Sequence, residues 1–451
     1  MELTDLTARV RHTQKKLRLL AISGVLDQFD RDIMNLDDEK RRSKYAKMAA
    51  SPFSFFRGSA YLFYFDVSRE WFPYHSSPER PTWIQGDLHF ENFGAFRSES
   101  GRIVFDVNDF DEGYTGSYLY DILRMSVSIG LVLRMNGIAP NYQREALESY
   151  LSAYVKQIRK FAKRKEDPRT IAFDTDTTEG PIRKLLKKME KRSASHLLED
   201  VTVWTEEGRQ FRWSDEIQQP TEAERAMLIA GWNDYIASLD PETKRQAEYY
   251  KIKDIAVKHG SGTASIGLDR FYVLIEGERS SNEALDDIVI EIKEVRGPVP
   301  AYFLPYNESF WDRYAHQGKR VIMTQRAMHH EADPFLGYLT MDGRTFYARE
   351  RSPFKKKLKA DKIADMEEWT SVLQCMGRIT AKLHARADAD VDQGLLSHHS
   401  EDEIAGAIGD DIDGFCDYVA NWALSYAHQV EEDYTMFCEW AAELSSKTGS
   451  K

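Results

Sequence analysis

Polar residues follow two short apolar runs in the stretch between residues 84 and 121. The stretch contains, in order, I-Q-G-D-L-H-F-E-N-F-G, I-V-F-D-V-N-D-F-D-E-G and L-Y-D-I-L-R. The apolar runs at 82–85 and 102–107 predict strands, and the S-E-S-G between them, at 98–101, predicts a hairpin-like connection. Neighbouring strand ends would then bring together five side chains: Asp87, His89, Asn92, Asp109 and Asp111. Such a cluster suits the binding of a hard divalent cation and the orientation of a nucleophile beside it.

The length and charge of the chain narrow the classes of protein to which it can belong. Its 451 residues are enough for two or three domains or lobes with sizeable cores. The hydrophobic fraction of 42% and the charged fraction of 30% are ordinary for a globular protein. The net charge of -12 argues against a general nucleic-acid binder, so we expect no nucleic-acid partner.

The cysteines and the absence of long apolar runs indicate the compartment. Cys375, Cys416 and Cys438 are odd in number and widely spaced, which predicts neither a disulfide framework nor a zinc site. The opening sequence M-E-L-T-D-L-T-A-R-V-R-H lacks the apolar core of a signal peptide. No run approaches the ~18 apolar residues of a membrane span. We therefore expect a cytoplasmic protein with no membrane partner.

The hydrophobic pattern predicts a mixed α+β fold. Helices are expected at 119–135, over most of 141–250 with a loop at 174–181, and at 307–330 and 369–387. Alternating β-branched residues predict strands at 255–277 and 287–295 and a hairpin at 336–350. The predicted division has four parts: an N-terminal helical and aromatic segment at 1–82, catalytic and metal loops with a helical substrate region at 83–250, a nucleotide-binding sheet and helix at 251–350, and C-terminal helices at 351–451.

The aromatic segment at 51–65 holds a single arginine, Arg57, beside Gly58. Arg57 is interpreted either as a snorkelling arginine on a buried element or as an anion contact at the edge of the site. The sequence leaves both interpretations open.

Asp87, Asn92 and Asp109 have the order and spacing of catalytic groups in phosphoryl transfer. That reaction needs a carboxylate to orient the acceptor hydroxyl, and oxygen ligands to hold Mg²⁺ on the phosphates. An Asp with an Asn five positions later is the catalytic-loop spacing of kinases, and an Asp-Phe-acidic turn after the next hairpin supplies the metal aspartate. We therefore predict Asp87 as the base-like group and Asn92 and Asp109 as metal ligands. Asp121 is expected to brace the loop; the alternative for the whole set is a satisfied polar network.

A second group of residues suits the binding of nucleotide phosphates. Gly260, Ser261 and Gly262 belong to the turn G-S-G-T-A-S-I-G, and Lys293 lies on a later predicted strand, in I-E-I-K-E-V. Backbone amides at such a turn can approach phosphate oxygens, and a strand lysine can pair with the α- and β-phosphates. Glycines are also common at hairpin turns for steric reasons alone. The lysine strand and the helix after it favour the phosphate-binding interpretation.

With these motifs identified, the central stretch is similar to the aminoglycoside-phosphotransferase and protein-kinase-like superfamily. More narrowly, S-P-F-S-F-F-R-G-S-A, I-Q-G-D-L-H-F-E-N-F-G, V-N-D-F-D-E and G-S-G-T-A-S-I-G-L-D-R-F-Y-V-L resemble a bacterial family known only as a domain of unknown function (number twenty-two fifty-two). This resemblance covers nearly the whole chain. It implies a kinase-like two-lobe fold with ATP and Mg²⁺ as cofactors, and it brings no established substrate.

The order of the motifs departs from that of an ordinary kinase. There the glycine loop and the lysine precede the catalytic loop, whereas here they follow it. The segment M-G-R-I-T-A-K-L-H-A, at 376–385, also resembles the helix that normally leads into G-D-x-H. Placing residues 252–390 before 83–135 restores the kinase order, so we predict a circular permutation, which proteins tolerate when their termini lie at the surface. A structure with Lys293 far from Asp109 would contradict this prediction.

The partner of Lys293 is a second departure. Kinases pair this lysine with a glutamate on the following helix. The expected acidic position is Met323 here, with Gln325 nearby, and Glu308 at the helix start is the other candidate. A neutral or displaced partner leaves both an active enzyme and a degenerate nucleotide binder open.

Three functions are consistent with these residues. The leading hypothesis is an ATP- and Mg²⁺-dependent phosphotransferase that acts on a small-molecule or protein hydroxyl, with nucleotidyl transfer as a variant. The second is a pseudokinase or nucleotide-sensing interaction protein. The third is a metal-dependent phosphoesterase, which is disfavoured because His89 is the only histidine of the cluster and such sites recruit several.

Overall fold

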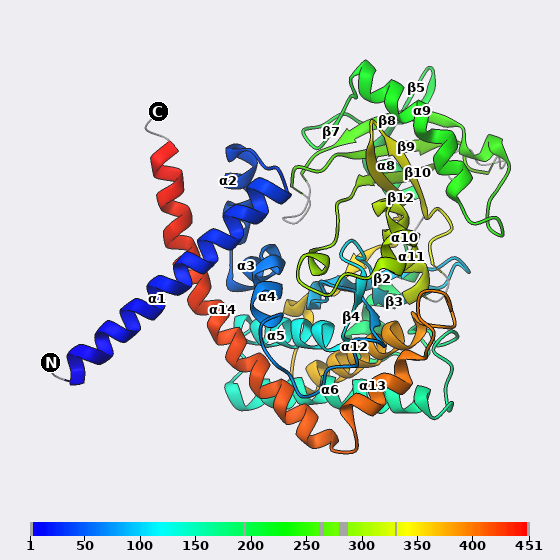
Figure 1. The fold of residues 1–451 in the computed structure, drawn as a ribbon. Coiled ribbons are helices and arrows are strands. Elements are labelled where there is room, and N and C mark those ends of the chain that lie inside the picture. The colour runs from blue at the N-terminus through cyan, green and yellow to red at the C-terminus, as the bar shows by residue number, and fades with distance from the viewer. Residues whose placement is uncertain (1–2, 193–194, 261–265, 279–286, 330–331, 449–451) are drawn as a thin grey trace.

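An antiparallel sheet of six strands forms one part of the molecule (Figure 1). The computed structural model describes residues 3–192, 195–260, 266–278, 287–329 and 332–448. The strand order across the sheet is β11-β12-β10-β9-β8-β7. The bounds are β7 Ile217–Gln218, β8 Ile252–Lys258, β9 Arg270–Ile275, β10 Ile288–Glu294, β11 Gly337–Met341 and β12 Arg344–Glu350.

Alternation along the strands assigns the two faces of this sheet. On β9, Phe271 and Val273 pack with α9 (Glu222–Ser238), whereas Tyr272 packs on the opposite face with residues around Phe211. Successive side chains of a strand point to opposite faces, so Lys293 on β10 lies on the face away from α9. The sheet therefore directs Lys293 toward the rest of the molecule.

Long helices form the other part and enclose the largest hydrophobic core. Helices α6 and α12 pack closely because Gly377 of α12 has no side chain: a Cβ there would lie 2.3 Å from the backbone oxygen of Tyr150. The helices of this part are α5 Leu119–Met135, α6 Pro140–Ala162, α7 Gly180–Glu190, α12 Met366–Arg386, α13 Ser400–Ile408 and α14 Ile412–Thr448.

The N-terminal helices pack beside these two parts (Figure 1). Helix α1 crosses α14, and a π-helical turn at Phe29–Ile33 joins α1 to the following segment. Arg18 of α1 is held by Asp66 and Asp433, through Nη2–Oδ2 distances of 2.7 and 2.6 Å. The four N-terminal helices are α1 Leu3–Gln28, α2 Asp38–Met48, α3 Pro52–Gly58 and α4 Ala60–Val67.

Short elements connect the sheet and the helices. The strands β1 and β4 pair with each other, β13 joins the β2–β3 hairpin, and β5 pairs with β6. Their bounds are β1 Thr82–Ile84, β2 Phe93–Arg97, β3 Ile103–Val107, β4 Tyr114–Gly116, β5 Thr202–Thr205, β6 Gly208–Phe211 and β13 Lys356–Lys357. Three short helices complete the fold: α8 Ser195–Val201, α10 Glu308–Tyr314 and α11 Gln317–Met328.

The structure confirms the mixed α+β class, the helices at 119–135 and 369–387 and the hairpin at 336–350. It corrects three other predictions. The hairpin partner of the strand at 103–107 is β2, not the run at 82–85, which pairs with β4. The predicted helix at 307–330 is two helices, because the His316 side chain accepts a hydrogen bond from the backbone of Lys319 and begins a new one.

The third correction concerns residues 141–250. This region is not helical throughout: it contains the β5–β6 hairpin, and its two-residue strand β7 joins the large sheet beside β8. The pairing of β7 depends on a distant strand, so a local pattern cannot reveal it. The four-part division of the chain remains a prediction. No helix among the described ranges is long and apolar enough to cross a membrane.

Candidate functional site

Asp121 holds the loop that contains Asp87. Its two carboxylate oxygens accept hydrogen bonds from the backbone N–H groups of Gln85 (2.6 Å) and Gly86 (2.9 Å). His384 of α12 contacts the same carboxylate, with Nε2 3.2 Å from Oδ2. Asp121 is fully buried, so these bonds are formed away from water, where they rigidify the loop. The predicted bracing role of Asp121 is confirmed.

The loop after β1 and the loop after β3 meet at Gly86. This glycine has a φ of +89°, and a Cβ would lie 2.1 Å from the backbone oxygen of Glu112. Only glycine combines this φ with so close an approach. The sequence G-D-L-H therefore places Asp87 directly against the D-F-D-E turn.

These two loops and the sheet line one cavity of about 80 Å³. The acidic loops contribute four carboxylates and two amides to its wall, and β10 contributes a lysine. The lining side chains that carry this chemistry are Gln85, Asp87, Asn92, Asp109, Asp111, Glu112 and Lys293. The predicted catalytic, metal and lysine positions thus meet at one place.

The N-terminal segment forms another wall of this cavity. Phe29, Ile33, Met34 and Lys44 line it, together with Arg57 of α3. The sequence interpretation did not assign residues 1–50 to the site, because nothing in their pattern points to chemistry. Their role depends on how α1 and α2 pack, which the local sequence does not reveal.

Arg124 holds Asp87 in place. Its Nε donates to Oδ1 of Asp87 at 2.5 Å, and the fully buried guanidinium lies 4.3 Å from the ring centroid of Phe56. Burial raises the pKa of Asp87, although the Arg124 charge acts in the opposite direction. The sequence analysis missed Arg124; the signal was an arginine three residues after Asp121, within the mostly apolar helix α5.

Two oxygens facing this region have no hydrogen-bond partner within the described part of the chain. They are Oδ1 of Asn92 and Oδ1 of Asp111, and both atoms are buried. Asp109 lines the same cavity with an exposed side chain. Buried oxygens without a donor are costly, and carboxylate and amide oxygens are the ligands that Mg²⁺ accepts. The residues present therefore fit a magnesium ion.

Lys293 pairs with Asp111, and both side chains are largely buried. Burial alone would lower the pKa of Lys293, but the Asp111 carboxylate outweighs it and the pKa is raised. This pair replaces the expected partners on the following helices: Glu308 instead lines a separate hollow of about 530 Å³, beside Ser117. The expectation of a glutamate or Gln325 as the partner is corrected.

The glycine turn is only partly described. Gly260 has a φ of +76° and lies beside the side chain of Glu216 rather than on the cavity wall. Ser261 and Gly262 lie outside the described residues. Leu268, at the end of the same connection, does line the cavity.

Arg57 lines the cavity, and His89 is buried behind it, outside the lining. The Arg57 Nη1 donates to Glu91 at 2.6 Å, and its Nε lies 3.2 Å from Nε2 of His89. Burial and the nearby Arg57 charge lower the pKa of His89 well below its usual value, so the ring is neutral at pH 7. Arg57 is about one-third exposed and faces the cavity, a position from which it can contact an anion.

Glu112 is a partly buried carboxyl group of the cavity whose pKa is also raised. Burial raises the pKa of Glu112 to about 7, while a hydrogen bond from the backbone of Val299 opposes the rise. The carboxyl group is therefore partly protonated at neutral pH. It lines the cavity beside Asp87 and Asp111, whose negative charges act in the same direction as burial.

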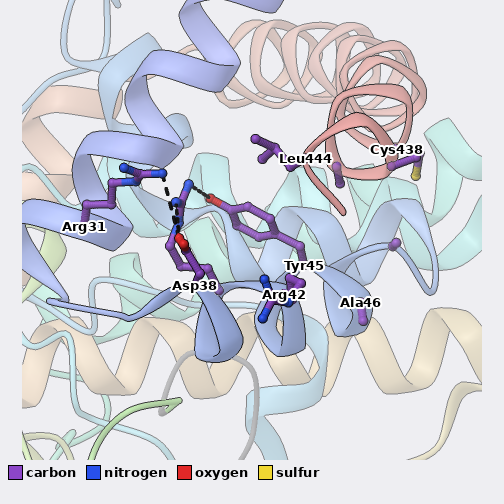
Figure 2. A pocket seen from close by; sticks show the side chains of 11 residues that line it. Arg31, Asp38, Arg42, Tyr45, Ala46, Cys438 and Leu444 are labelled. Carbon is purple, nitrogen blue, oxygen red and sulfur yellow. Dashed lines mark hydrogen bonds and ion pairs between the residues drawn. The ribbon is translucent and has the colours of Figure 1, made fainter. Parts of the chain in front are cut away.

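A second hollow, of about 310 Å³, lies between α2 and the end of α14 (Figure 2). Figure 2 shows Arg31 and Asp38 on one side, where they form an ion pair. Asp38 also contacts Arg41. The opposite side is formed by Cys438, Leu444 and two alanines of α14. The candidate catalytic residues do not line it, so we assign the functional site to the first cavity.

A sequence model of a bacterial family matches residues 36–440 of this chain. The family is described as uncharacterized protein conserved in bacteria (DUF2252). The chain belongs to this family. No curated protein matches the sequence, and no solved structure does. The matched range contains the two site loops, Lys293 and α12, so the DUF2252 region includes all the chemistry of the cavity except the residues before position 36.

Proposed function

We propose that this DUF2252 protein is an ATP- and Mg²⁺-dependent phosphotransferase that acts on a small-molecule or protein hydroxyl. One observation carries the proposal. Asp87, Asn92, Asp109 and Lys293 line a single cavity, although the Lys293–Asp111 pair joins positions 182 residues apart. A cavity in which several polar groups and titratable residues with shifted pKa values meet is a candidate ligand site.

The arrangement of the sheet supports a kinase-like fold with permuted chain order. Strands β8, β9 and β10 are consecutive antiparallel neighbours, and Lys293 lies on the third, as the corresponding lysine does in protein kinases. Helix α12 then contacts the catalytic loop through His384 and Asp121. This packing is therefore compatible with the proposed circular permutation, in which residues 252–390 correspond to the first part of a kinase and residues 83–135 to the part that follows.

Each residue would have a distinct role in the reaction. Oδ2 of Asp87 remains available to orient the acceptor hydroxyl, because Arg124 occupies Oδ1. Asn92 and Asp109 would hold magnesium, with Asp111 Oδ1 beside them; the bound ion supplies neutralisation of phosphate charge. Lys293 would exchange part of its contact with Asp111 for phosphate oxygens.

The size of the cavity sets a condition on this proposal. A volume of about 80 Å³ holds an ion and a few water molecules, each of which takes about 30 Å³ in the liquid, but not a nucleotide. Met34 and Phe29 occupy one side of it. Nucleotide entry therefore requires this N-terminal turn to move away from the loops.

A nucleotide-sensing protein without transferase activity is the second candidate. Two observations favour it: Lys293 lacks a helix glutamate as partner, and the N-terminal turn closes the cavity. Such a protein would bind Mg·ATP and change the position of the turn without turnover.

Calorimetric titration with ATP and with a non-hydrolysable analogue, each with and without Mg²⁺, tests the proposal. We expect magnesium-dependent binding that Asp109→Ala and Lys293→Ala both weaken at least tenfold. Lys191→Ala and Asp312→Ala remove exposed charges that do not line the cavity and serve as matched controls. Absence of nucleotide binding to the wild type would overturn both candidates. Binding without ATP turnover, across a panel of hydroxyl acceptors, would favour the sensor.

A further inference from the structure

A second cluster of metal-ligating side chains lies away from the cavity, where α12 ends and α13 begins. Asp388, His399 and Glu401 each offer one ligand atom, and these atoms lie within 4.8 Å of one another. The Asp388 and Glu401 carboxylates are almost completely buried, whereas the His399 ring is 41% exposed. The two carboxylates are therefore shielded from solvent, whereas the histidine side of the cluster is accessible to solvent.

Backbone contacts fix Asp388 in this position. Its Oδ1 accepts a hydrogen bond from the backbone of Asp390 (2.9 Å), and its Oδ2 accepts one from Ser400 (2.8 Å). Arg164, just beyond α6, donates to Oε1 of Glu401 at 2.9 Å. Two nearby backbone N–H groups and the distant Arg164 thus hold the two carboxylates in place before any ligand is considered.

Unpartnered atoms distinguish this cluster from an ordinary acidic patch. Oε2 of Glu401 and Nδ1 of His399 are both buried, and neither has a hydrogen-bond partner among the residues that the structure describes. Nδ1 lies 3.6 Å from Oδ2 of Asp388, which is too long for a hydrogen bond. A buried polar atom left unpaired is costly, so two such atoms at one place indicate a missing binding partner.

A shared proton does not account for this arrangement. One proton between Asp388 and Glu401 would join the two carboxyl groups, but it would leave Nδ1 of His399 without a partner. A cation accepts lone pairs from both carboxylates and from Nδ1 at once. Arg164 offsets only one of the two negative charges.

We propose that Asp388, His399 and Glu401 bind a divalent transition metal ion, for which Zn²⁺ is the best match. One imidazole nitrogen with two carboxylate oxygens is a donor set that Zn²⁺ and Mn²⁺ accept, while Mg²⁺ and Ca²⁺ prefer oxygen ligands alone. Water would complete the coordination on the exposed side of His399. The bound ion would fix the loop after α12 to the start of α13, independently of the proposed phosphotransferase site.

Metal titration of the chelator-treated full chain tests this site. We expect one equivalent of Zn²⁺ to bind, and Mn²⁺ to bind more weakly. His399→Ala and Asp388→Asn should lower the affinity for Zn²⁺ at least tenfold, as the loss of a ligand does. Co²⁺ should give a visible absorption band in the wild type that His399→Ala lacks.

Two controls isolate the proposed metal site. His428→Ala removes an exposed histidine that lies near Glu431 and Glu432 on α14, so it tests adventitious binding by a surface histidine. Asp109→Asn alters the candidate magnesium site and leaves the Asp388 cluster intact. Both variants should retain the tight Zn²⁺ equivalent. Unchanged Zn²⁺ affinity in His399→Ala, or a wild type that takes up no Zn²⁺, would overturn the proposal; equal unfolding temperatures of the metal-free variants would show that they fold.

Discussion

At the scale of single residues, Gly86 determines how closely the two site loops approach. Replacement by alanine would place a Cβ 2.1 Å from the backbone oxygen of Glu112, at a φ of +89°. The Gly86 backbone cannot move away without breaking its hydrogen bond to Asp121, so Gly86→Ala should destabilise the fold by about 3 kcal/mol or more. Gly137→Ala is the matched control, since Gly137 has a φ of +73° and open space around it. Urea unfolding should show a loss of only about 1 kcal/mol there.

At the same scale, the raised pKa of Glu112 predicts how the stability of the protein depends on pH. Burial raises the pKa of Glu112 from 4.5 to about 7, so the folded protein binds more protons than the unfolded chain between these values. Stability should therefore fall as the pH rises through this range, by about 2–3 kcal/mol. Glu112→Gln keeps the acceptor for Val299 and removes the titration. Urea midpoints in EDTA should match the wild type at pH 4.5 and exceed it at pH 8; parallel pH curves would contradict this.

At the scale of elements, the π-helical turn and Met34 form one wall of the cavity, and in the proposed function they restrict nucleotide entry. Met34 is buried, and Arg296 Nη1 lies 3.0 Å from its sulfur. Met34→Ala should enlarge the cavity and strengthen Mg·ATP binding several-fold, while the lost packing costs about 2–3 kcal/mol. Met48→Ala, in the core of α2 and away from the cavity, should cost as much stability without changing nucleotide affinity. Equal affinities of the two variants in calorimetry would show that the turn does not restrict entry.

The elements also show what the sequence could and could not predict. The sequence predicts Asp87, Asn92 and Asp109 as site residues because each belongs to a short contiguous loop. In such a loop, the spacing between the residues is enough to indicate their chemistry. Lys293 was found from the alternation of its strand. Its pairing with Asp111 was not predicted, because the partner comes from a distant loop rather than from the next helix.

The missed features share one physical property: they depend on packing between distant segments. Arg124 lies on α5, and the hydrophobic pattern of this helix indicates only that it is buried. The contact between Arg124 and Asp87 depends on how α5 packs against the loop. The N-terminal wall of the cavity requires the crossing of α1 and α14. Local periodicity contains no information on either arrangement.

At the scale of the whole molecule, Arg18 joins the two ends of the chain. Its guanidinium binds Asp66 of α4 and Asp433 of α14 in a doubly bidentate arrangement, with N–O distances of 2.6–2.9 Å. The Asp433 side chain is 1% exposed. Removal of the arginine would leave two carboxylates without their cation. Arg18→Met should therefore lower the free energy of unfolding by about 3 kcal/mol.

The contacts of Arg18 with Asp66 and Asp433 also position the N-terminal turn over the candidate site. Loss of these contacts should therefore loosen that turn as well. We expect faster amide hydrogen exchange in α1 and in residues 29–34 of Arg18→Met, with exchange in the six-stranded sheet unchanged. Arg18→Lys should be intermediate, because an ammonium cannot bind both carboxylates in bidentate fashion. Lys15→Met removes the exposed contact with Glu439 and should cost less than about 0.5 kcal/mol. Equal stability of the Arg18 and Lys15 variants would mean that hydrophobic packing alone holds α1 to α14.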